Sequence, residues 1–330
     1  MSAPAAPVLE VTDLRVSFRT DDGVVRAVDG VSYAVRPGEV LGVVGESGCG
    51  KSVTNLAVMG LLAKPAGRVD GGSVRFEGRE LLGLPEREMR KVRGNRIAMI
   101  FQDPMTSLNP FLSVEEQLAE VGVLHLGLTR PQAVARAVEL LARVGISDPA
   151  RRIRAYPHEF SGGMRQRVMI AMALLCDPAV LIADEPTTAL DVTIQAQILD
   201  LLRELQRERG MAVVLVTHDL GVVAGVADRV VVMYAGQVVE EAPTPALFAR
   251  PSHPYTSALL RSVPRVAGDA HARLAPIEGM PPRLDRELVG CRFAPRCALV
   301  RDACRAGAPP LVAAGAGRLR RCVVPVEEVR

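Results

Sequence analysis

Hydrophobic and polar residues follow different periods in different parts of this 330-residue chain. Residues 8–36 alternate apolar and polar positions on both sides of the turn Asp21-Asp22-Gly23, which predicts antiparallel strands. Elsewhere, short continuous apolar runs predict strands that are covered on both faces, as in a parallel sheet. These runs occupy residues 40–44, 97–101, 180–183 and 213–217.

Segments with helical spacing lie between the apolar runs. They occupy residues 52–62, most of residues 113–145, and residues 195–207. This alternation of strands and helices predicts a doubly wound α/β core. After about residue 262 the chain becomes rich in Pro, Gly and Arg and loses its periodicity, which predicts a domain boundary there.

Composition narrows the class of protein. Apolar residues make up 48% of the chain but aromatic residues only 3%, so the core must be aliphatic. A net charge of +3 is too small to indicate a nucleic-acid partner. The first residues, MSAPAAPVLEV, lack the regions of a secretion signal, and no apolar run approaches the ~20 residues of a membrane helix. We therefore expect a cytoplasmic protein that meets a membrane only through partners.

A glycine-rich turn follows the first buried strand. Residues 45–52, GESGCGKS, fit the pattern GxxxxGK[ST] between a strand and a helix. Glycines let backbone N–H groups converge on phosphate oxygens, and the helix N-terminus adds its positive end. Lys51 is expected to reach the β- and γ-phosphates of a nucleotide, and Ser52 to bind Mg²⁺. The predicted nucleotide contacts in this region are Gly45, Ser47, Gly48, Cys49, Gly50, Lys51, Ser52 and Val53.

Two adjacent acids end the buried strand at residues 180–183. Carboxylates at the C-terminal end of a parallel strand fit a ligand crevice. Asp184 is expected to hold Mg²⁺, directly or through water, and Glu185 to polarise the water that attacks the nucleotide.

A second anion site is predicted at Ser161-Gly162-Gly163, which opens a helix with a hydroxyl and unpaired N–H groups. If this turn lies far from the 45–52 loop within one molecule, both cannot hold the same nucleotide. A head-to-tail dimer solves this, because each nucleotide then lies between the 45–52 loop of one subunit and the Ser161 turn of the other.

In this order the motifs resemble those of the nucleotide-binding subunits of ATP-binding cassette (ABC) transporters, over residues 8–262. The resemblance implies an ABC nucleotide-binding domain at residues 1–262, with a RecA-like core, an antiparallel β subdomain and a helical subdomain at about residues 103–175. A small Cys-rich C-terminal domain would follow at residues 263–330.

The resemblance also implies roles for individual residues. Gln102 would sense the γ-phosphate, contact Mg²⁺ and face the membrane subunit, and His218 would hold the γ-phosphate and the catalytic Glu185. Phe18 would stack on adenine. Thr188-Ala189-Leu190-Asp191 would form the loop that communicates across the dimer. Ser161, Gly162, Gly163 and Asp191 would bind the nucleotide in trans. With Lys51, Asp184, Glu185 and His218 all in place, a cassette that binds but does not hydrolyse ATP is disfavoured.

Finer segments resemble the ATPases of oligopeptide/dipeptide permeases. They are FQDPMTSLNP at 101–110, TTALDVTIQAQ at 187–197 and SHPYT at 252–256. Met105 and Met164 resemble the D-type subunit, which implies an F-type ATPase partner, two permease subunits, an extracytoplasmic peptide-binding protein and a peripheral place on the cytoplasmic face of the membrane. Nickel and glutathione importers share these features and stay open as alternatives. Soluble ABC ATPases of DNA repair or ribosomes usually carry two cassettes, coiled coils or zinc insertions, none of which is visible.

Four of the six cysteines, Cys291, Cys297, Cys304 and Cys322, lie within 32 residues. They could be incidental small apolar residues. Disulfides are disfavoured in the cytosol, and the paired spacing common in zinc sites is absent, although four-cysteine zinc stays possible. Four thiolates also suit an iron–sulfur cluster. Because the resemblance implies a [4Fe–4S] cluster in some members, we predict such a cluster here.

Overall fold

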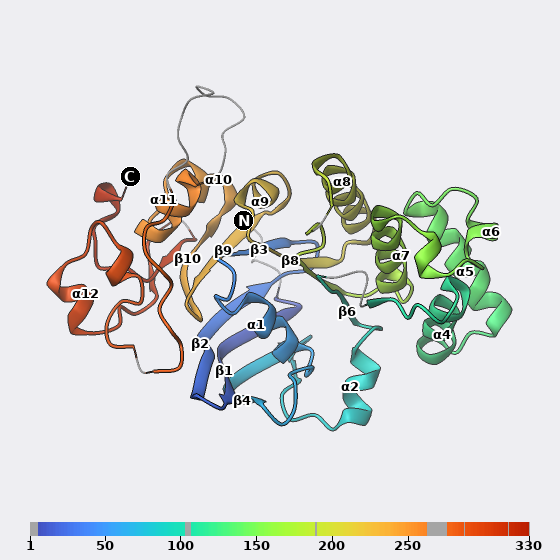
Figure 1. Ribbon diagram of the computed structural model, residues 1–330, viewed down its shortest axis with the longest axis horizontal. Coiled ribbons are helices and arrows are strands. Elements are labelled where there is room, and N and C mark those ends of the chain that lie inside the picture. The colour runs from blue at the N-terminus through green and yellow to red at the C-terminus, as the bar shows by residue number, and fades with distance from the viewer. Residues whose placement is uncertain are drawn as a thin grey trace. The chain divides into compact units, whose positions relative to one another are not determined.

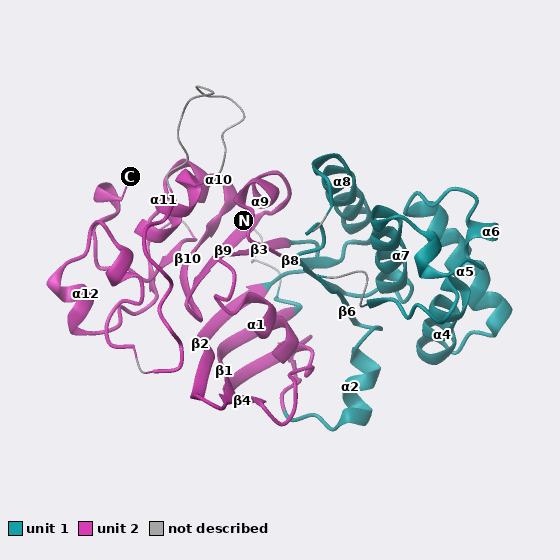
Figure 2. Cartoon of the chain, in the orientation of Figure 1, with its two compact units in different colours: residues 1–8, 35–39, 83–214 teal, residues 9–34, 40–82, 215–330 magenta. Residues whose placement is uncertain are grey.

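The computed structural model describes residues 6–102, 107–188, 190–262, 276–286, 288–315 and 317–329 (Figure 1). The chain divides into two compact units (Figure 2). Unit 1 comprises residues 1–8, 35–39 and 83–214, and unit 2 comprises residues 9–34, 40–82 and 215–330. Each unit therefore gathers segments that are far apart in the sequence.

Unit 2 contains an antiparallel sheet with the strand order β2-β1-β4-β5. Its strands are β1 (Leu9–Thr20), β2 (Gly23–Val35), β4 (Gly67–Phe76) and β5 (Arg79–Glu80). Leu9, Val11, Leu14 and Val16 of β1 are buried, so the alternation seen in the sequence marks the inner face of this sheet. Helix α1 (Lys51–Val58) contacts β1.

Other strands of unit 2 lie in the order β11-β12-β10-β9-β3. They are β3 (Val40–Val44), β9 (Arg229–Tyr234), β10 (Gln237–Pro243), β11 (Val312–Ala313) and β12 (Leu319–Arg320). All five residues of β3 are buried, and β3 pairs in parallel with β9. The helical segments are α9 (Leu220–Val226), α10 (Thr244–Ala249), α11 (Pro254–Arg261), η2 (Ala294–Arg296), α12 (Asp302–Ala306) and η3 (Val326–Glu328). Helix α9 contacts β3, and α10 contacts both α9 and β10.

Unit 1 contains the parallel pair β6 (Ile97–Ile100) and β7 (Val180–Asp184), followed in the sheet order by β8 (Ala212–Thr217), whose first residues belong to this unit. Its helical segments are α2 (Glu86–Val92), α4 (Val114–Leu126), α5 (Arg130–Arg143), α6 (Pro149–Arg152), η1 (Pro157–Glu159), α7 (Gly162–Leu174) and α8 (Val192–Arg209). Helices α4, α5 and α7 pack on one another (Figure 1). None of the helices in the described ranges is both long and apolar enough to cross a membrane.

The strands predicted from continuous apolar runs correspond to β3, β6, β7 and β8. The predicted helix at residues 52–62 is shorter in the structure, because Gly60 adopts a left-handed φ of 62° and the Leu61 N–H donates to Leu56 O at 2.7 Å, which closes α1. The helical stretch at residues 113–145 is interrupted at Gly127, whose φ of 65° ends α4.

The separate C-terminal domain is not confirmed. Strand β12 pairs with β10, and β11 with β12, so these two short strands of residues 263–330 extend the sheet of unit 2. The sequence after residue 262 predicted a separate domain because it is rich in Pro and Gly and shows no periodicity. In the structure, side chains attach this segment to the sheet; Arg321, for example, donates to Val238 O. The domain limits 1–262, 263–330 and 103–175 stay predictions.

Candidate functional site

The 45–52 loop connects β3 to α1 in unit 2, and two of its glycines are required by close backbone approach. Gly45 has a φ of 156° and Gly50 a φ of 102°. A Cβ atom at Gly45 would lie 2.2 Å from Met233 O, and one at Gly50 would lie 2.5 Å from Ala27 O. No other residue fits these positions without moving the backbone, so the loop geometry follows from the glycine spacing.

Lys51 is the first residue of α1, and only 4% of it is exposed. Its Nζ donates to Gly45 O at 2.7 Å and to Glu46 O at 3.1 Å, so the side chain turns back over the loop that precedes it. Ser52 and Val53 follow in the first helical turn and are half-buried. The ammonium group and the N-terminal N–H groups of α1 thus lie at the same loop, as an anion site requires.

The rest of the loop consists of an exposed tip and a buried cysteine. Ser47 and Gly48 are exposed. Cys49 is buried, and this burial raises the pKa of its thiol. Its carbonyl accepts the Gly236 N–H at 2.9 Å, which ties the loop to the turn between β9 and β10. Cys49 therefore packs as a neutral small side chain.

Phe18 and His218 also belong to unit 2. Phe18 is half-buried on β1 and lies over Gly67 of β4, where a Cβ atom would be only 2.8 Å from the ring. His218 is exposed and directly follows β8. The next residue, Asp219, caps α9 by accepting the Gly221 N–H at 2.7 Å. The roles of Phe18 in adenine stacking and of His218 as a switch stay predictions.

Unit 1 brings Gln102, Asp184 and Glu185 to one edge of its parallel strands. Gln102 follows β6, while Asp184 ends β7 and Glu185 follows it. Gln102 Nε2 donates to Glu185 Oε2 at 3.1 Å, although 83 residues separate them. Asp184 is buried, with 4% exposed. Parallel strands end at the same edge, which explains why an amide and two carboxylates meet here.

Glu185 has a left-handed φ of 48°, which costs a residue with a side chain about 1–2 kcal/mol. The turn that holds it is closed by Thr188, whose N–H donates to Glu185 O at 3.2 Å and whose hydroxyl donates to Glu185 Oε2 at 2.9 Å. Gln102 and Thr188 therefore orient the same carboxylate oxygen. The resemblance placed Thr188 in the loop that communicates across the dimer, but its hydrogen bond to the Glu185 carboxylate was not predicted from the sequence.

The Ser161 turn lies in unit 1 as well. Ser161 is the N-cap of α7 and accepts the Met164 N–H at 3.4 Å. Ser161 and Gly162 are exposed. A Cβ atom at Gly163 would lie 2.8 Å from the Ile194 side chain, so this glycine allows α7 to approach the start of α8. Asp191 caps α8 by accepting the Ile194 N–H at 2.9 Å, which places it beside this turn.

The predicted site residues are thus distributed over the two units. Unit 2 holds the 45–52 loop, Phe18 and His218, and unit 1 holds Gln102, Asp184, Glu185, the Ser161 turn and Asp191. The sequence predicted the 45–52 loop, but not the side chains from other parts of unit 2 that contact it. In unit 2, Glu46 N–H donates to the Tyr255 hydroxyl at 2.9 Å, and the Glu46 carboxylate pairs with Arg296. With 250 residues between Glu46 and Arg296, the sequence contains no signal for this pair.

The four clustered cysteines form no preassembled ligand group in the described part of the chain. All four lie in the described ranges, yet within those ranges no group of three or more His, Cys, Asp or Glu side chains could hold a metal ion. Burial raises the pKa of Cys291 and Cys322, and raises that of Cys297 to about 11, so these thiols are neutral while no metal is bound. Cys304 Sγ accepts the Arg301 N–H at 3.4 Å, and Cys322 Sγ accepts the Val324 N–H at 3.4 Å. The predicted iron–sulfur cluster is therefore not confirmed.

The chain is similar to known protein families and to solved structures. Residues 28–188 match the family described as ABC transporter, and residues 239–304 match the family described as oligopeptide/dipeptide transporter, C-terminal region. The oligopeptide transport ATP-binding protein OppD of Salmonella typhimurium is 55% identical, over 99% of this chain and 96% of its own length. OppD of Escherichia coli is 54% identical, over 98% of this chain and 95% of its own length. A dimeric ATP-binding cassette solved in a post-hydrolysis state with ADP and Pi is 28% identical and covers 72% of this chain and 98% of its own, with a TM-score of 0.64.

Proposed function

Since this chain belongs to the ABC transporter family, among the ATP-binding proteins of oligopeptide transport, we propose that its 45–52 loop binds the phosphates of ATP and that Glu185 activates water for hydrolysis. The predicted ABC cassette fold is confirmed, and the chain is an ABC ATPase that serves a peptide importer. The observation that carries the site proposal is the 45–52 loop, where Lys51 is buried against carbonyl groups at the N-terminus of α1.

Phosphate binding rests on the groups that converge at this loop. The Lys51 ammonium would move from Gly45 O and Glu46 O to phosphate oxygens, while N–H groups of the loop and of α1 donate to them. The predicted Mg²⁺ ligands are Ser52 of unit 2 and Asp184 and Gln102 of unit 1, which carry hydroxyl, carboxylate and amide oxygens of the kind Mg²⁺ prefers. Gln102 uses Nε2 to bond Glu185, so its amide oxygen is the atom suited to a cation. When bound, Mg²⁺ would neutralise charge on the phosphates.

Hydrolysis requires a base that is already oriented. Gln102 and Thr188 both donate to Glu185 Oε2, which holds the carboxylate in one rotamer at the end of β7. We propose that this carboxylate accepts the proton of the attacking water. The turn to Thr188 holds the backbone of Glu185 in a left-handed conformation, which sets the direction in which the side chain leaves the end of β7.

The exposed Ser161 turn supports a dimer in which it completes the nucleotide site of a second cassette. Its hydroxyl and N–H groups face outward at the N-terminus of α7, beside Asp191. The similar cassette with ADP and Pi is described as dimeric. We propose that the second cassette is an F-type ATPase, as the D-type resemblance of Met105 and Met164 implies; Met105 lies outside the described residues.

The full assembly would comprise both cassettes, two permease subunits and an extracytoplasmic peptide-binding protein, with this chain bound peripherally at the cytoplasmic face. The relatives that align with nearly the whole chain are named for oligopeptide or peptide transport. Their names support peptides, rather than nickel or glutathione, as the substrate.

Short peptides delivered by the binding protein are expected to stimulate ATP hydrolysis by the purified complex. The reason is that substrate delivery favours the closed arrangement of the cassettes, in which both halves of the site meet. Phosphate release would be measured in proteoliposomes, with nickel and glutathione as controls. Stimulation by either control, and not by peptides, would contradict the substrate assignment. A complex that contains two copies of this chain and no second cassette would contradict the F-type partner.

An iron–sulfur cluster stays a separate prediction. The density of cysteines and their mutual electrostatic interactions support it, whereas the missing ligand group in the described residues speaks against it. Protein purified without oxygen is expected to contain four iron and four sulfide per chain. Iron, sulfide and zinc analysis checks this, with the Cys291→Ser, Cys297→Ser double variant as control. One zinc without sulfide, or no metal, would refute the prediction.

A further inference from the structure

Few aromatic residues occur in this chain, yet several gather beside the 45–52 loop in unit 2. Tyr234 of β9 and Tyr255 of α11 have ring centroids 4.6 Å apart. Phe293 approaches both rings edge-on, at 5.3 Å from Tyr234 and 5.4 Å from Tyr255. Since the Tyr255 hydroxyl accepts the Glu46 N–H, this block connects the cysteine segment, residues 291–297, to the loop.

Arg296 makes the charged connection between the same two parts. Its Nη1 and Nη2 donate to the two oxygens of the Glu46 carboxylate, at 2.7 and 3.0 Å. The remaining donors bond the Tyr234 hydroxyl at 3.3 Å, Ile277 O at 3.1 Å and Glu278 O at 3.0 Å. Every N–H of the guanidinium therefore has a partner, in a fork geometry that a lysine cannot reproduce.

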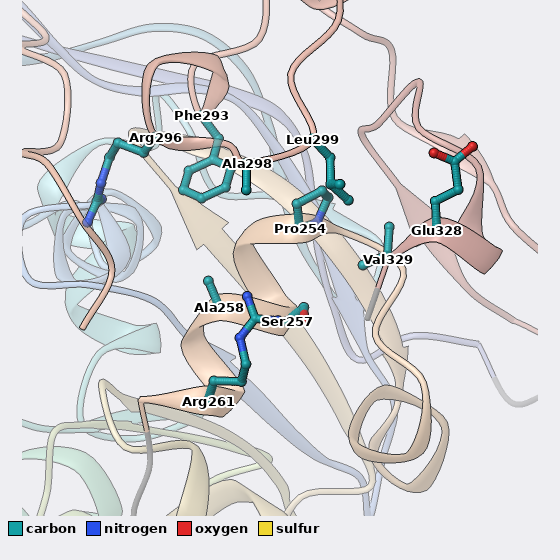
Figure 3. Close-up of a pocket in the computed structure, with 10 residues that line it drawn as sticks. All are labelled: Pro254, Ser257, Ala258, Arg261, Phe293, Arg296, Ala298, Leu299, Glu328 and Val329. Atoms are coloured by element: carbon teal, nitrogen blue, oxygen red, sulfur yellow. The ribbon is translucent and has the colours of Figure 1, made fainter. Parts of the chain in front are cut away.

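The ion pair is largely shielded from water. Only 4% of the Arg296 side chain and 26% of the Glu46 side chain are exposed. In Figure 3, Phe293 and Arg296 are among the residues that line a cavity of about 270 Å³ next to α11, together with Pro254 and Ala258. A buried pair of this kind leaves an uncompensated charge when one partner is removed.

A second arginine of the segment supports the same region. Arg292 pairs with Asp29 and donates to Ala235 O, at the turn between β9 and β10. The next residue of that turn, Gly236, donates to Cys49 O within the loop. The cysteine segment thus reaches the 45–52 loop by two routes, one of which ends on the Glu46 carboxylate itself.

We propose that Arg296 is a positioning residue for nucleotide binding, which neutralises Glu46 and holds it away from the phosphates of ATP. Glu46 lies in the loop that receives the triphosphate, so an unpaired carboxylate there would repel it. Arg296 removes this repulsion without touching the nucleotide, and the bond from Glu46 N–H to Tyr255 fixes the backbone at the same point. This inference rests on the proposal that the 45–52 loop binds ATP.

The test is nucleotide affinity in the full-length protein, measured with a fluorescent N-methylanthraniloyl ATP and Mg²⁺. Arg296→Gln is expected to weaken binding by about tenfold or more, because the half-buried carboxylate of Glu46 loses its partner. The Arg296→Gln, Glu46→Gln double variant is expected to regain most of that loss, since it removes the repelling charge as well. Glu46→Gln alone is expected to bind at least as tightly as the wild type, because it leaves the positive charge of Arg296 without its partner beside the loop. Arg305→Gln, which changes an exposed arginine of α12 in the same unit, is the matched control.

Steady-state kinetics of the transporter complex separate a loss of nucleotide affinity from a general loss of folding or catalysis. Arg296→Gln is expected to raise KM for ATP by about the same factor while kcat changes less than about twofold, because Glu185 is untouched. Wild-type affinity in Arg296→Gln, or a double variant as weak as the single one, would overturn the proposal. If Arg296→Gln does not fold, the nucleotide affinity of Glu46→Gln tests the proposal instead. Weaker binding by Glu46→Gln than by the wild type would contradict the charge argument. Lys51→Ala, measured in parallel, tests the loop itself: if it binds like the wild type, the proposed ATP site fails instead.

Discussion

Glu185→Gln is expected to lower ATP hydrolysis by the transporter complex by about 10²–10⁴-fold while ATP still binds. The amide keeps the size of the side chain and can still accept from Gln102 and Thr188, but it cannot take a proton from water. The variant should therefore accumulate an ATP-loaded closed dimer. Phosphate release at saturating ATP measures the first effect, and size-exclusion chromatography with and without ATP measures the second.

The control for this variant is Glu204→Gln, an exposed glutamate on α8 of the same unit. It changes the net charge by the same amount and should hydrolyse ATP at the wild-type rate. Hydrolysis by Glu185→Gln at the wild-type rate would exclude Glu185 as the base. A variant that neither hydrolyses nor binds ATP would point to a folding defect, which circular dichroism would reveal.

Lys51→Ala is expected to weaken ATP binding by about 10²–10³-fold, and hydrolysis at fixed ATP should fall with it. Lys51 is buried, and its removal takes away the ammonium that faces the phosphates as well as the donor to Gly45 O and Glu46 O. Binding is measured by titration with the fluorescent ATP analogue at constant Mg²⁺.

Lys64→Ala provides the matched comparison, because Lys64 is an exposed lysine of the same unit. Its affinity should equal that of the wild type. Thermal unfolding of both variants separates a lost phosphate contact from a collapsed loop. Unchanged nucleotide affinity in a folded Lys51→Ala variant would be incompatible with the 45–52 loop as the phosphate site.

Local motifs were predictable because their geometry depends on neighbouring residues. A run of apolar residues before Gly45 predicted β3, and helical spacing after Lys51 predicted α1. The glycines at 45 and 50 occupy positions where a Cβ atom would meet backbone carbonyls. The run that ends in Asp184 predicted β7 with two acids at its edge. Such features need only periodicity, turn chemistry and the small size of glycine.

Tertiary structure decided which distant groups act on these motifs. Gln102 reaches the carboxylate of Glu185 only because β6 and β7 end at the same edge, and Glu46 meets Arg296 only because the cysteine segment folds onto unit 2. Cysteine spacing likewise indicated a metal site, yet the described thiols form no ligand group. Spacing along the chain constrains neighbours in sequence, whereas bonds between residues hundreds of positions apart depend on how sheets and loops pack.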